Sequence, residues 1–351
     1  MNDTFNTKEM LMFKNILKIA SITILSIGFS TSSTLASNEQ LSSLSHEDRL
    51  ILSEVYLMNG LVDKANDEIV SLAKEGHPES QYILYNDIKN GLRPNFGWSK
   101  EEIKSLIIDS AKNGYLPSIQ QRVIEIERIY KTDDELLNDE EWKSLVTLGF
   151  DKEDIGFSLS YAKWKIFKEQ STNKDEILMK LEKIADKTYS EDIIMFLGDY
   201  YALTEGNVEK SQKWYLKAVR MGSGNAANNL AYSWINVDLF IEQALELSKL
   251  AVALDPNPSN LDTLAWIYFK KKNFDDAYSL IKKAYSQDST NWEIVLHKAA
   301  VEKELGLFKD AVNSYMRALD MLNELGQKET IDKHLPDLIK ELNDLIEKSH
   351  I

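Results

Sequence analysis

One phrase occurs twice in this sequence, 38 positions apart. Residues 73–84 read AKEGHPESQYIL, and residues 111–122 read AKNGYLPSIQQR. Its small-x-x-Gly-aromatic element recurs in weaker form, and the aligned copies are Ala73/Gly76/His77, Ala111/Gly114/Tyr115, Val146/Gly149/Phe150, Ala185/Thr188/Tyr189 and Val219/Gly222. Successive copies lie 38, 35, 39 and 34 residues apart, a period typical of stacked helical repeats. The period predicts an all-α chain built from two-helix units.

The turns and helix starts of these units have local signals. Glycine ends helices because it adopts the left-handed conformation without a steric penalty, so each repeated glycine predicts a helix end. Helix starts are predicted where a short oxygen-bearing side chain precedes an acidic residue by three positions. Five pairs fit this pattern: Ser45 with Asp48, Ser99 with Glu102, Thr132 with Glu135, Asn138 with Glu141, and Thr172 with Asp175.

Toward the C-terminus the period becomes tighter and small residues pair. Three segments, 242–256, 275–288 and 309–322, carry alanines seven positions apart: Ala244/Ala251, Ala277/Ala284 and Ala311/Ala318. Two alanines on one helical face allow a neighbouring helix to approach closely, and Ile281 and Tyr315 are expected to fill the space between hairpins. The first segment has Ser248 at that position, so Leu247 is expected to fill it instead. These segments are predicted to be the second helices of stacked hairpins.

These motifs resemble two related repeat families. Residues 224–323 resemble tetratricopeptide repeats, through Leu264, Ala265 and Tyr268 in a first helix, Asn273-Phe274 in a turn and Asp255-Pro256 after a helix. Residues 62–223 resemble the Sel-one-like repeat, and the matching segments are 197–201, 205–208, 213–218 and the Gly-containing loop 90–98. The resemblance implies a right-handed α-solenoid of stacked antiparallel helix hairpins. It also implies an interaction scaffold, and a buried aromatic at Trp214.

The predicted organisation has four parts. Residues 1–36 resemble a secretory signal: lysines in 14–18, an apolar run at 19–29 and a small-residue cleavage site ending at Ala36. The apolar run is too short to span a membrane. It has no polar face, so an amphipathic first helix of the mature protein is not expected. The translation start is Met1, Met10 or Met12. Sel-one-like repeats at 37–223, tetratricopeptide repeats at 224–323 and a C-terminal capping helix at 324–351 follow. We expect a periplasmic or secreted bacterial protein without stable membrane insertion.

Composition and motif searches exclude several function classes. Forty-one Lys and Arg against 56 Asp and Glu, with an isoelectric point near 4.9, disfavour a nucleic-acid partner. There is no cysteine, and no two of the five histidines have metal-binding spacing. The acidic stretch 133–142 lacks the central glycine of a calcium-binding loop. Residues 222–227 (GSGNAA) resemble part of a dinucleotide-binding loop, but no predicted strand precedes them, so a turn between two helices is expected there. We therefore expect no catalytic residues, cofactor or metal.

The candidate partner-binding residues lie on the predicted first helices, which line the concave side in the resembled families. Trp266 is rotated by roughly 200° from Leu264 and Tyr268, so it is expected to point away from its own hairpin. The candidate set on this face is Asn228, Asn229, Tyr232, Asp262, Trp266, Phe269 and Lys270. The alternative is that Trp266 fills the seam between adjacent first helices. The carboxylate-binding clamp of some tetratricopeptide domains is absent, because Asp262, Trp266, Leu296 and Ala300 occupy its positions.

Three hypotheses about function remain from the sequence. The first is a scaffold or adaptor that binds a protein partner in the bacterial envelope. The second is a periplasmic immunity protein that neutralises a toxin or lipase effector, which the acidic composition favours because inhibitors often complement basic toxins. The third, an enzyme, has no convergent set of catalytic side chains in its support.

Overall fold

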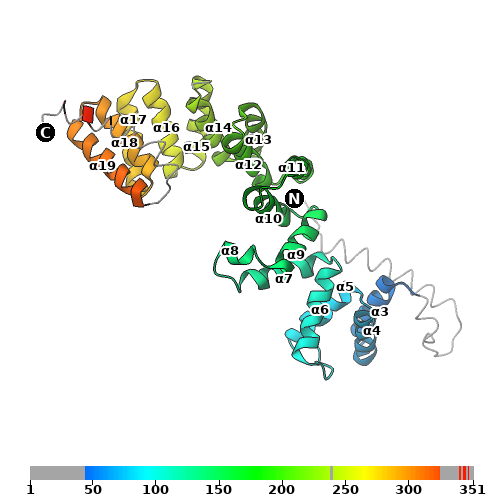
Figure 1. The fold of residues 1–351 in the computed structure, drawn as a ribbon. Helices are drawn as coiled ribbons and strands as arrows, with labels where there is room; N and C mark the ends of the chain where they lie inside the picture. Colours follow the sequence, from blue (N-terminus) through cyan, green and yellow to red (C-terminus); the bar gives the residue numbers. More distant parts are fainter. Residues whose placement is uncertain (1–43, 238–239, 325–339, 341–342, 345–346, 348–351) are drawn as a thin grey trace, which may run out of the picture. The chain divides into compact units, whose positions relative to one another are not determined.

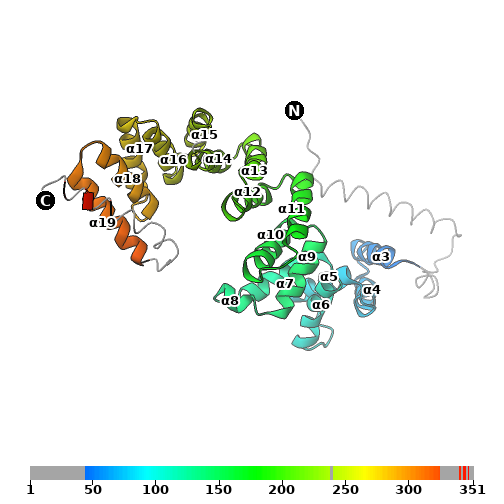
Figure 2. The same ribbon diagram turned by 45° about the horizontal axis from the view of Figure 1, so that its top comes forward.

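The computed structural model describes residues 44–237 and 240–324, together with residues 340, 343, 344 and 347. All regular secondary structure within these residues is helical, and consecutive helices pack against one another. The chain divides between Trp164 and Lys165 into two compact units (Figures 1 and 2). None of the described helices is long and apolar enough to cross a membrane.

The first unit is a succession of helices with two local apolar cores. One core centres on Ile69, Leu72, Leu84 and Ile107, and the other on Ile119, Trp142, Leu145 and Phe157. The helices are α3 (His46–Met58), α4 (Val62–Lys74), α5 (Pro78–Lys89), α6 (Lys100–Lys112), α7 (Leu116–Glu127), α8 (Asp133–Leu136), α9 (Glu140–Asp151) and α10 (Ile155–Lys163).

The second unit begins within a π-helical turn that crosses the division. Its hairpins are α12 with α13, α14 with α15, α16 with α17, and α18 with α19. The elements are η1 (Trp164–Lys168), α11 (Lys174–Thr188), α12 (Glu191–Asp199), η2 (Tyr200–Thr204), α13 (Val208–Arg220), α14 (Gly224–Asn236), α15 (Ile241–Leu254), α16 (Pro258–Lys270), α17 (Phe274–Gln287), α18 (Trp292–Glu304) and α19 (Phe308–Glu324).

Three of the five predicted helix starts are confirmed and two are wrong. Ser45, Ser99 and Thr132 accept a hydrogen bond from the backbone N–H three residues later, and Ser99 forms a complete capping box with Glu102. Asp139, rather than Asn138, caps α9, because its Oδ1 accepts from the Trp142 N–H at 2.7 Å. Helix α11 begins after Asn173 without a side-chain cap, so Thr172 is not its cap.

In the third repeat, helix α9 ends later in the sequence than the repeated phrase predicts. Gly149 lies inside α9 and is buried, and the left-handed residue that ends this hairpin is Glu153, with φ of 57°. The glycine is required there because the Phe157 ring packs directly on its Cα. Similarly, Tyr189 rather than Thr188 adopts the left-handed conformation in the fourth repeat. The left-handed residue therefore lies four positions after the aligned glycine in the third copy and one position after Thr188 in the fourth.

The alanine pairs predicted to lie between helices are all fully buried. Ala244/Ala251, Ala277/Ala284 and Ala311/Ala318 have no exposed surface, and Trp214, Ile281 and Tyr315 are buried as predicted. The expectation for Leu247 is wrong: this side chain is half-exposed, and Leu245 is buried instead. Ser248 faces the core. Around the axis of α15, the side chain of Leu247 is rotated by about 100° from that of Ser248, so it points away from the core. Leu245 lies nearly one helical turn before Ser248 and therefore on the same side of the helix.

The first helices of the second unit pack side by side. Helix α16 contacts both α14 and α18, while the second helices make fewer contacts with each other. The surface shared by α14, α16 and α18 is called the first-helix face below, and it forms the inner side of this run of hairpins. The fold class, an all-α solenoid of antiparallel hairpins, is confirmed.

Two predicted segments lie outside the described residues. They are the secretory signal at 1–36 and nearly all of the capping helix predicted at 324–351. The predicted boundary between repeat types at 223 and 224 stays a prediction.

Candidate functional site

An aromatic stack connects two neighbouring first helices on the first-helix face. The Trp266 ring on α16 lies 4.6 Å from the Phe269 ring at an interplanar angle of 8°. The same indole lies 4.1 Å from the His297 ring on α18, at 16°. Trp266 thus occupies the seam between α16 and α18 and still keeps part of its surface exposed.

A carboxylate fixes the histidine of this stack. Nδ1 of His297 lies 2.9 Å from both oxygens of Asp262, and the two side chains are 12% and 10% exposed. Asp262 precedes Trp266 by one helical turn, so both side chains face α18. This hydrogen-bonded contact therefore holds the imidazole flat against the indole.

Tyr232 on α14 borders the same cluster. Burial raises the pKa of the Tyr232 phenol, a hydrogen bond involving Asn236 lowers it, and the nearby carboxylates of Glu293 and Asp262 raise it further. Glu293 lies on α18, one turn before His297, and is half-buried. Three successive first helices thus bring an aromatic and acidic cluster onto one face.

The two asparagines of the predicted set lie at the other end of the face. Asn229 Nδ2 donates to Asp199 Oδ1 at 3.1 Å, and the Tyr215 hydroxyl donates to the same oxygen at 2.7 Å. Asn228 is buried, and its Oδ1 has no hydrogen-bond partner among the described residues. Asn229 therefore ties α14 to the preceding hairpin, and Asn228 donates to Asn229.

The structure brings together the central part of the predicted set. Tyr232, Asp262, Trp266 and Phe269 lie in or beside the cluster, whereas the side chain of Lys270 is exposed at the end of α16. Whether the set binds a partner stays a prediction. Sequence reasoning missed two further members, His297 and Glu293. His297 lies 35 positions after Asp262, close to the repeat period, and this spacing could have shown that the two residues sit on adjacent first helices.

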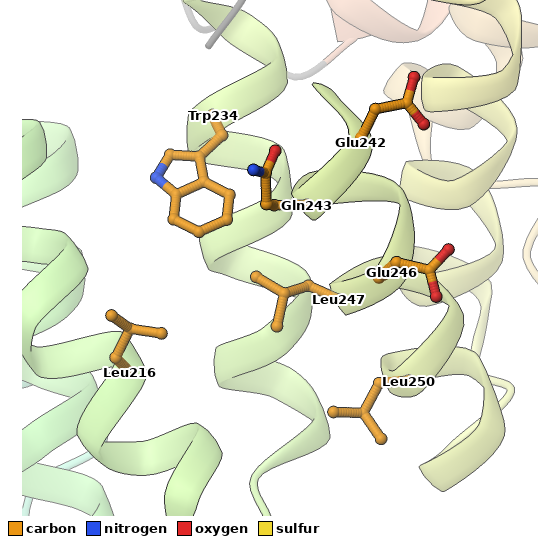
Figure 3. A pocket seen from close by; sticks show the side chains of 7 residues that line it. All are labelled: Leu216, Trp234, Glu242, Gln243, Glu246, Leu247 and Leu250. Atoms are coloured by element: carbon orange, nitrogen blue, oxygen red, sulfur yellow. The ribbon is translucent and has the colours of Figure 1, made fainter. Parts of the chain in front are cut away.

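A second surface feature lies on the opposite side of the hairpins. It is a groove of about 560 Å³ between α13, α14 and α15, lined by Leu216, Trp234, Gln243, Leu247 and Leu250 (Figure 3). Its rim carries Glu242 and Glu246, which form ion pairs with Lys271 and Lys249. This groove explains the exposure of Leu247.

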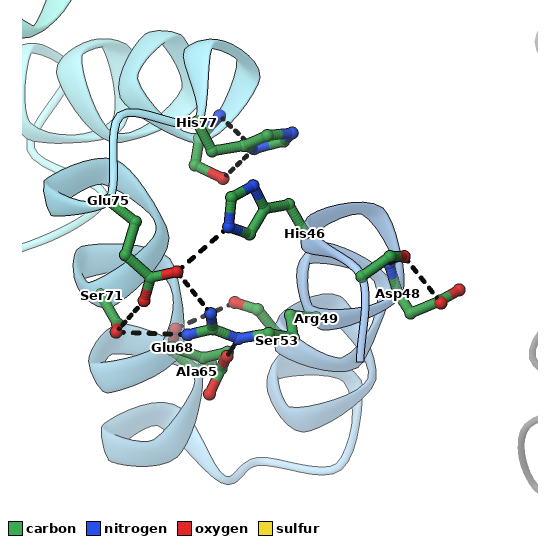
Figure 4. Close-up of polar contacts among 11 residues, drawn as sticks. His46, Asp48, Arg49, Ser53, Ala65, Glu68, Ser71, Glu75 and His77 are labelled. Carbon is green, nitrogen blue, oxygen red and sulfur yellow. Dashed lines mark hydrogen bonds and ion pairs between the residues drawn. The ribbon is translucent and has the colours of Figure 1, made fainter. Parts of the chain in front are cut away.

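A polar cluster in the first unit connects its first two helices. The Arg49 guanidinium on α3 forms ion pairs with Glu68 on α4 and with Glu75 at the end of α4, the latter at 2.6 Å (Figure 4). The hydrogen bond from Arg49 lowers the pKa of Glu75 to about 2, and His46 lies 3.2 Å from the same carboxylate. These ion pairs and the hydrogen bond from Arg49 to Ser71 join α3 to α4 and its end, so this cluster stabilises the hairpin. The described residues contain no group of three or more side chains arranged to hold a metal ion.

Comparisons with known proteins bear on the fold alone. No family model and no curated protein matches the chain. A protective antigen of uropathogenic Escherichia coli, c5321, which displays an SLR fold, is 15% identical with a TM-score of 0.51, covering 87% of this chain and 69% of that one.

Smaller solved structures match shorter stretches. MamA is 18% identical over 44% of this chain and 91% of its own, with a TM-score of 0.37. YrrB, a TPR protein with an unusual peptide-binding site, is 17% identical over 50% of this chain and 90% of its own, with a TM-score of 0.37. The similarity to c5321 agrees with the helix packing described above, so the protein is an α-solenoid with the fold of SLR-type helical repeats.

Proposed function

We propose that this protein is a non-catalytic interaction scaffold that binds a partner protein on its first-helix face. The observation that carries the proposal is the cluster of Tyr232, Trp266 and His297 on three successive first helices. Tyrosine and tryptophan are favoured anchors at protein interfaces, because they offer a large contact area and lose little side-chain entropy. A cluster supplied by three repeats presents such residues on a rigid surface.

The proposal includes an export step. The apolar run at 19–29 and the small-residue site ending at Ala36 support the proposal that a secretory signal is removed and that the protein resides in a bacterial envelope or outside the cell. Cell fractionation and N-terminal sequencing of the isolated protein test this step. A chain that keeps Met1, Met10 or Met12 at its N-terminus in the cytoplasm would contradict it.

The binding surface is tested by cross-linked capture of partners from the native cell, read by mass spectrometry. Trp266→Ala removes the central ring of the face, and we expect it to lose the captured partner while circular dichroism shows an unchanged helix content. Trp98→Ala is a matched control, because Trp98 is also half-buried but lies in the first unit. A Trp266→Ala protein that is less thermally stable and still captures the partner would show that the indole only fills the seam.

The same capture separates the scaffold from the immunity hypothesis. The carboxylates on the first-helix face favour a basic partner, which suits a toxin inhibitor as well as an adaptor. Recovery of several envelope components at modest stoichiometry supports an adaptor. Recovery of one secreted effector at near-equal stoichiometry supports an immunity protein.

A further inference from the structure

We infer that the groove between α13, α14 and α15 binds an amphipathic helix of a partner protein. The apolar side chains of this helix enter the groove, its basic edge lies along α15, and its acidic edge lies along α13. The inference does not depend on binding at the first-helix face, because the groove lies on the opposite side of the hairpins. It follows from one position of the repeat, from the spacing of exposed leucines and from the charges beside the groove.

One repeat position distinguishes α15 from the neighbouring second helices. Lys217 of α13 donates to Asp186 of α11 at 2.7 Å, and Arg317 of α19 donates to the Tyr285 hydroxyl of α17 at 2.8 Å. Each cation thus connects its helix to the helix two places earlier. The residue directly before the second buried alanine is Lys217 in α13, Leu250 in α15, Lys283 in α17 and Arg317 in α19. Leu250 cannot form such a bond to α13, and the groove lies at this junction (Figure 3).

The exposed residues of α15 have the spacing of a helix-packing stripe. Gln243, Leu247, Leu250 and Leu254 follow one another at steps of four, three and four, and the last two are 41% and 51% exposed. Apolar residues with this spacing form the line along which one helix packs on another. The same positions of α17 are Asp276, Leu280, Lys283 and Gln287. The stripe of α15 is therefore a local feature of this repeat, and no helix of the described chain covers it.

The groove has the size and lining to receive side chains from such a helix. Its volume is about 560 Å³, and Leu216 and Trp234 line it together with the α15 leucines (Figure 3). Helices that bind in grooves insert apolar side chains from positions i, i+3 or i+4, and i+7. These positions match the spacing along α15, so the stripe and the groove indicate the same kind of ligand.

The α15 side of the groove is acidic. The side chains of Glu242 and Glu246 are 74% and 73% exposed, and they pair with Lys271 and Lys249. Ion pairs this exposed contribute little to stability, so a basic residue of a partner can replace the lysine of either pair. The edge of the bound helix that faces α15 is therefore expected to carry lysine or arginine.

The α13 side of the groove is basic. Lys213 and Arg220 lie three residues before and four residues after Leu216, on the same face of α13, and both are exposed. Lys213 lies 4.6 Å from the Trp214 ring centroid, and neither cation forms an ion pair with an acid of the described chain. An acidic edge on the bound helix complements these cations, and opposite edges of opposite charge fix its orientation.

Fluorescence polarisation of labelled two-heptad peptides, added to the mature protein of residues 37–351, tests the inference. The test peptide carries leucines at heptad spacing, lysines along one edge and glutamates along the other. One control peptide has the same composition in scrambled order, and another has glutamates on both edges. We expect the test peptide to bind most tightly, because it alone matches the stripe and both charged sides.

Substitutions locate the binding site. Leu250→Lys introduces the residue that α13 and α17 carry at this position, so we expect an unchanged helix content and about tenfold weaker binding. Glu246→Lys reverses a charge on the α15 side and should weaken binding about threefold. Met316→Lys is the matched control, because Met316 is 52% exposed on α19, and it should leave the affinity unchanged.

Equal binding of the scrambled peptide, or unchanged affinity in Leu250→Lys, would overturn the inference. Sedimentation velocity tests a second copy as the occupant: a wild-type dimer that Leu250→Lys dissociates would refute the assignment to a partner protein. A labelled peptide of residues 325–351 that binds the wild type and not Leu250→Lys would refute it in favour of the chain's own C-terminal segment. Trp266→Ala should leave the test peptide bound, so this inference and the proposed function fail separately.

Discussion

The substitution Gly149→Ala tests how the third repeat packs. In the interior of a helix, alanine is favoured over glycine by about 1 kcal/mol, so helix propensity alone predicts a more stable protein. The structure predicts the opposite. A Cβ at position 149 would lie 2.1 Å from Cδ2, 2.3 Å from Cγ and 2.6 Å from Cβ of Phe157.

The magnitude follows from which atoms clash. Rotating the Phe157 ring cannot relieve a contact with its own Cβ, so the backbone of α10 must move away from α9. Overpacking of a core by a single carbon costs about 1–3 kcal/mol, and the upper part of that range applies when backbone has to shift. After the gain in helix propensity, we expect Gly149→Ala to destabilise the α9–α10 hairpin by about 2 kcal/mol.

The assay must report on this hairpin, because a chain of two units need not unfold in one step. Hydrogen exchange of the peptides that cover α9 and α10 gives the local free energy of opening. Gly156→Ala is the matched control: its Cβ would meet only Asp154 Oδ1, at 3.5 Å, so exchange should be unchanged or slower. A double variant with Phe157→Ala should show favourable coupling, since the ring atoms nearest to the new Cβ are gone. If Gly149→Ala protects α9 and α10 more strongly than the wild type, the packing argument is refuted.

Two further predictions concern a turn and a carboxylate. Lys272, in the turn between α16 and α17, is exposed and has a φ of 61°, so Lys272→Gly should stabilise the protein against chemical unfolding by about 1 kcal/mol. Gly306 lies in the matching turn between α18 and α19 and has a φ of 76°. Gly306→Ala should therefore destabilise the protein by a similar amount. Equal effects of the same sign would contradict the turn assignment. Because Arg49 lowers the pKa of Glu75 from 4.5 to about 2, the stability that this pair contributes is complete above about pH 4.5 and is lost as pH falls toward 2. Glu75→Gln should lower the melting temperature at neutral pH and flatten the acid part of its pH dependence; an unchanged pH profile would argue against the ion pair.

The helical period was readable from sequence because it depends on local chemistry. Gly76 and Gly114 adopt left-handed conformations at the ends of α4 and α6, where the repeated phrase predicts helix ends. The capping oxygens of Ser45 and Ser99 act within three residues of themselves. The buried alanine pairs follow from the 3.6-residue turn of a helix, which a linear sequence records directly.

The candidate site was only partly readable. The orientation of Trp266 followed from its position relative to Leu264 and Tyr268, and Asp262 lies one turn away on the same helix. His297 and Glu293 come from the next hairpin, and nothing near them in sequence marks them as neighbours of Trp266. The stack of His297 on the indole depends on how closely α18 approaches α16.

The sequence by itself determined the all-helical class, the two-helix repeat and three of the five helix starts it predicted, because each depends on interactions between residues a few positions apart. Tertiary structure decided where the period slips and which surfaces are left open. Gly149 is a packing residue because Phe157 returns onto it from α10, so the turn moves to Glu153. Leu247 lines a groove that residues of α13, α14 and α15 form together, and no local pattern encodes this packing of three helices. Contacts between hairpins depend on the summed packing of many side chains, and they place Asp262 and His297 at 2.9 Å across 35 positions of chain.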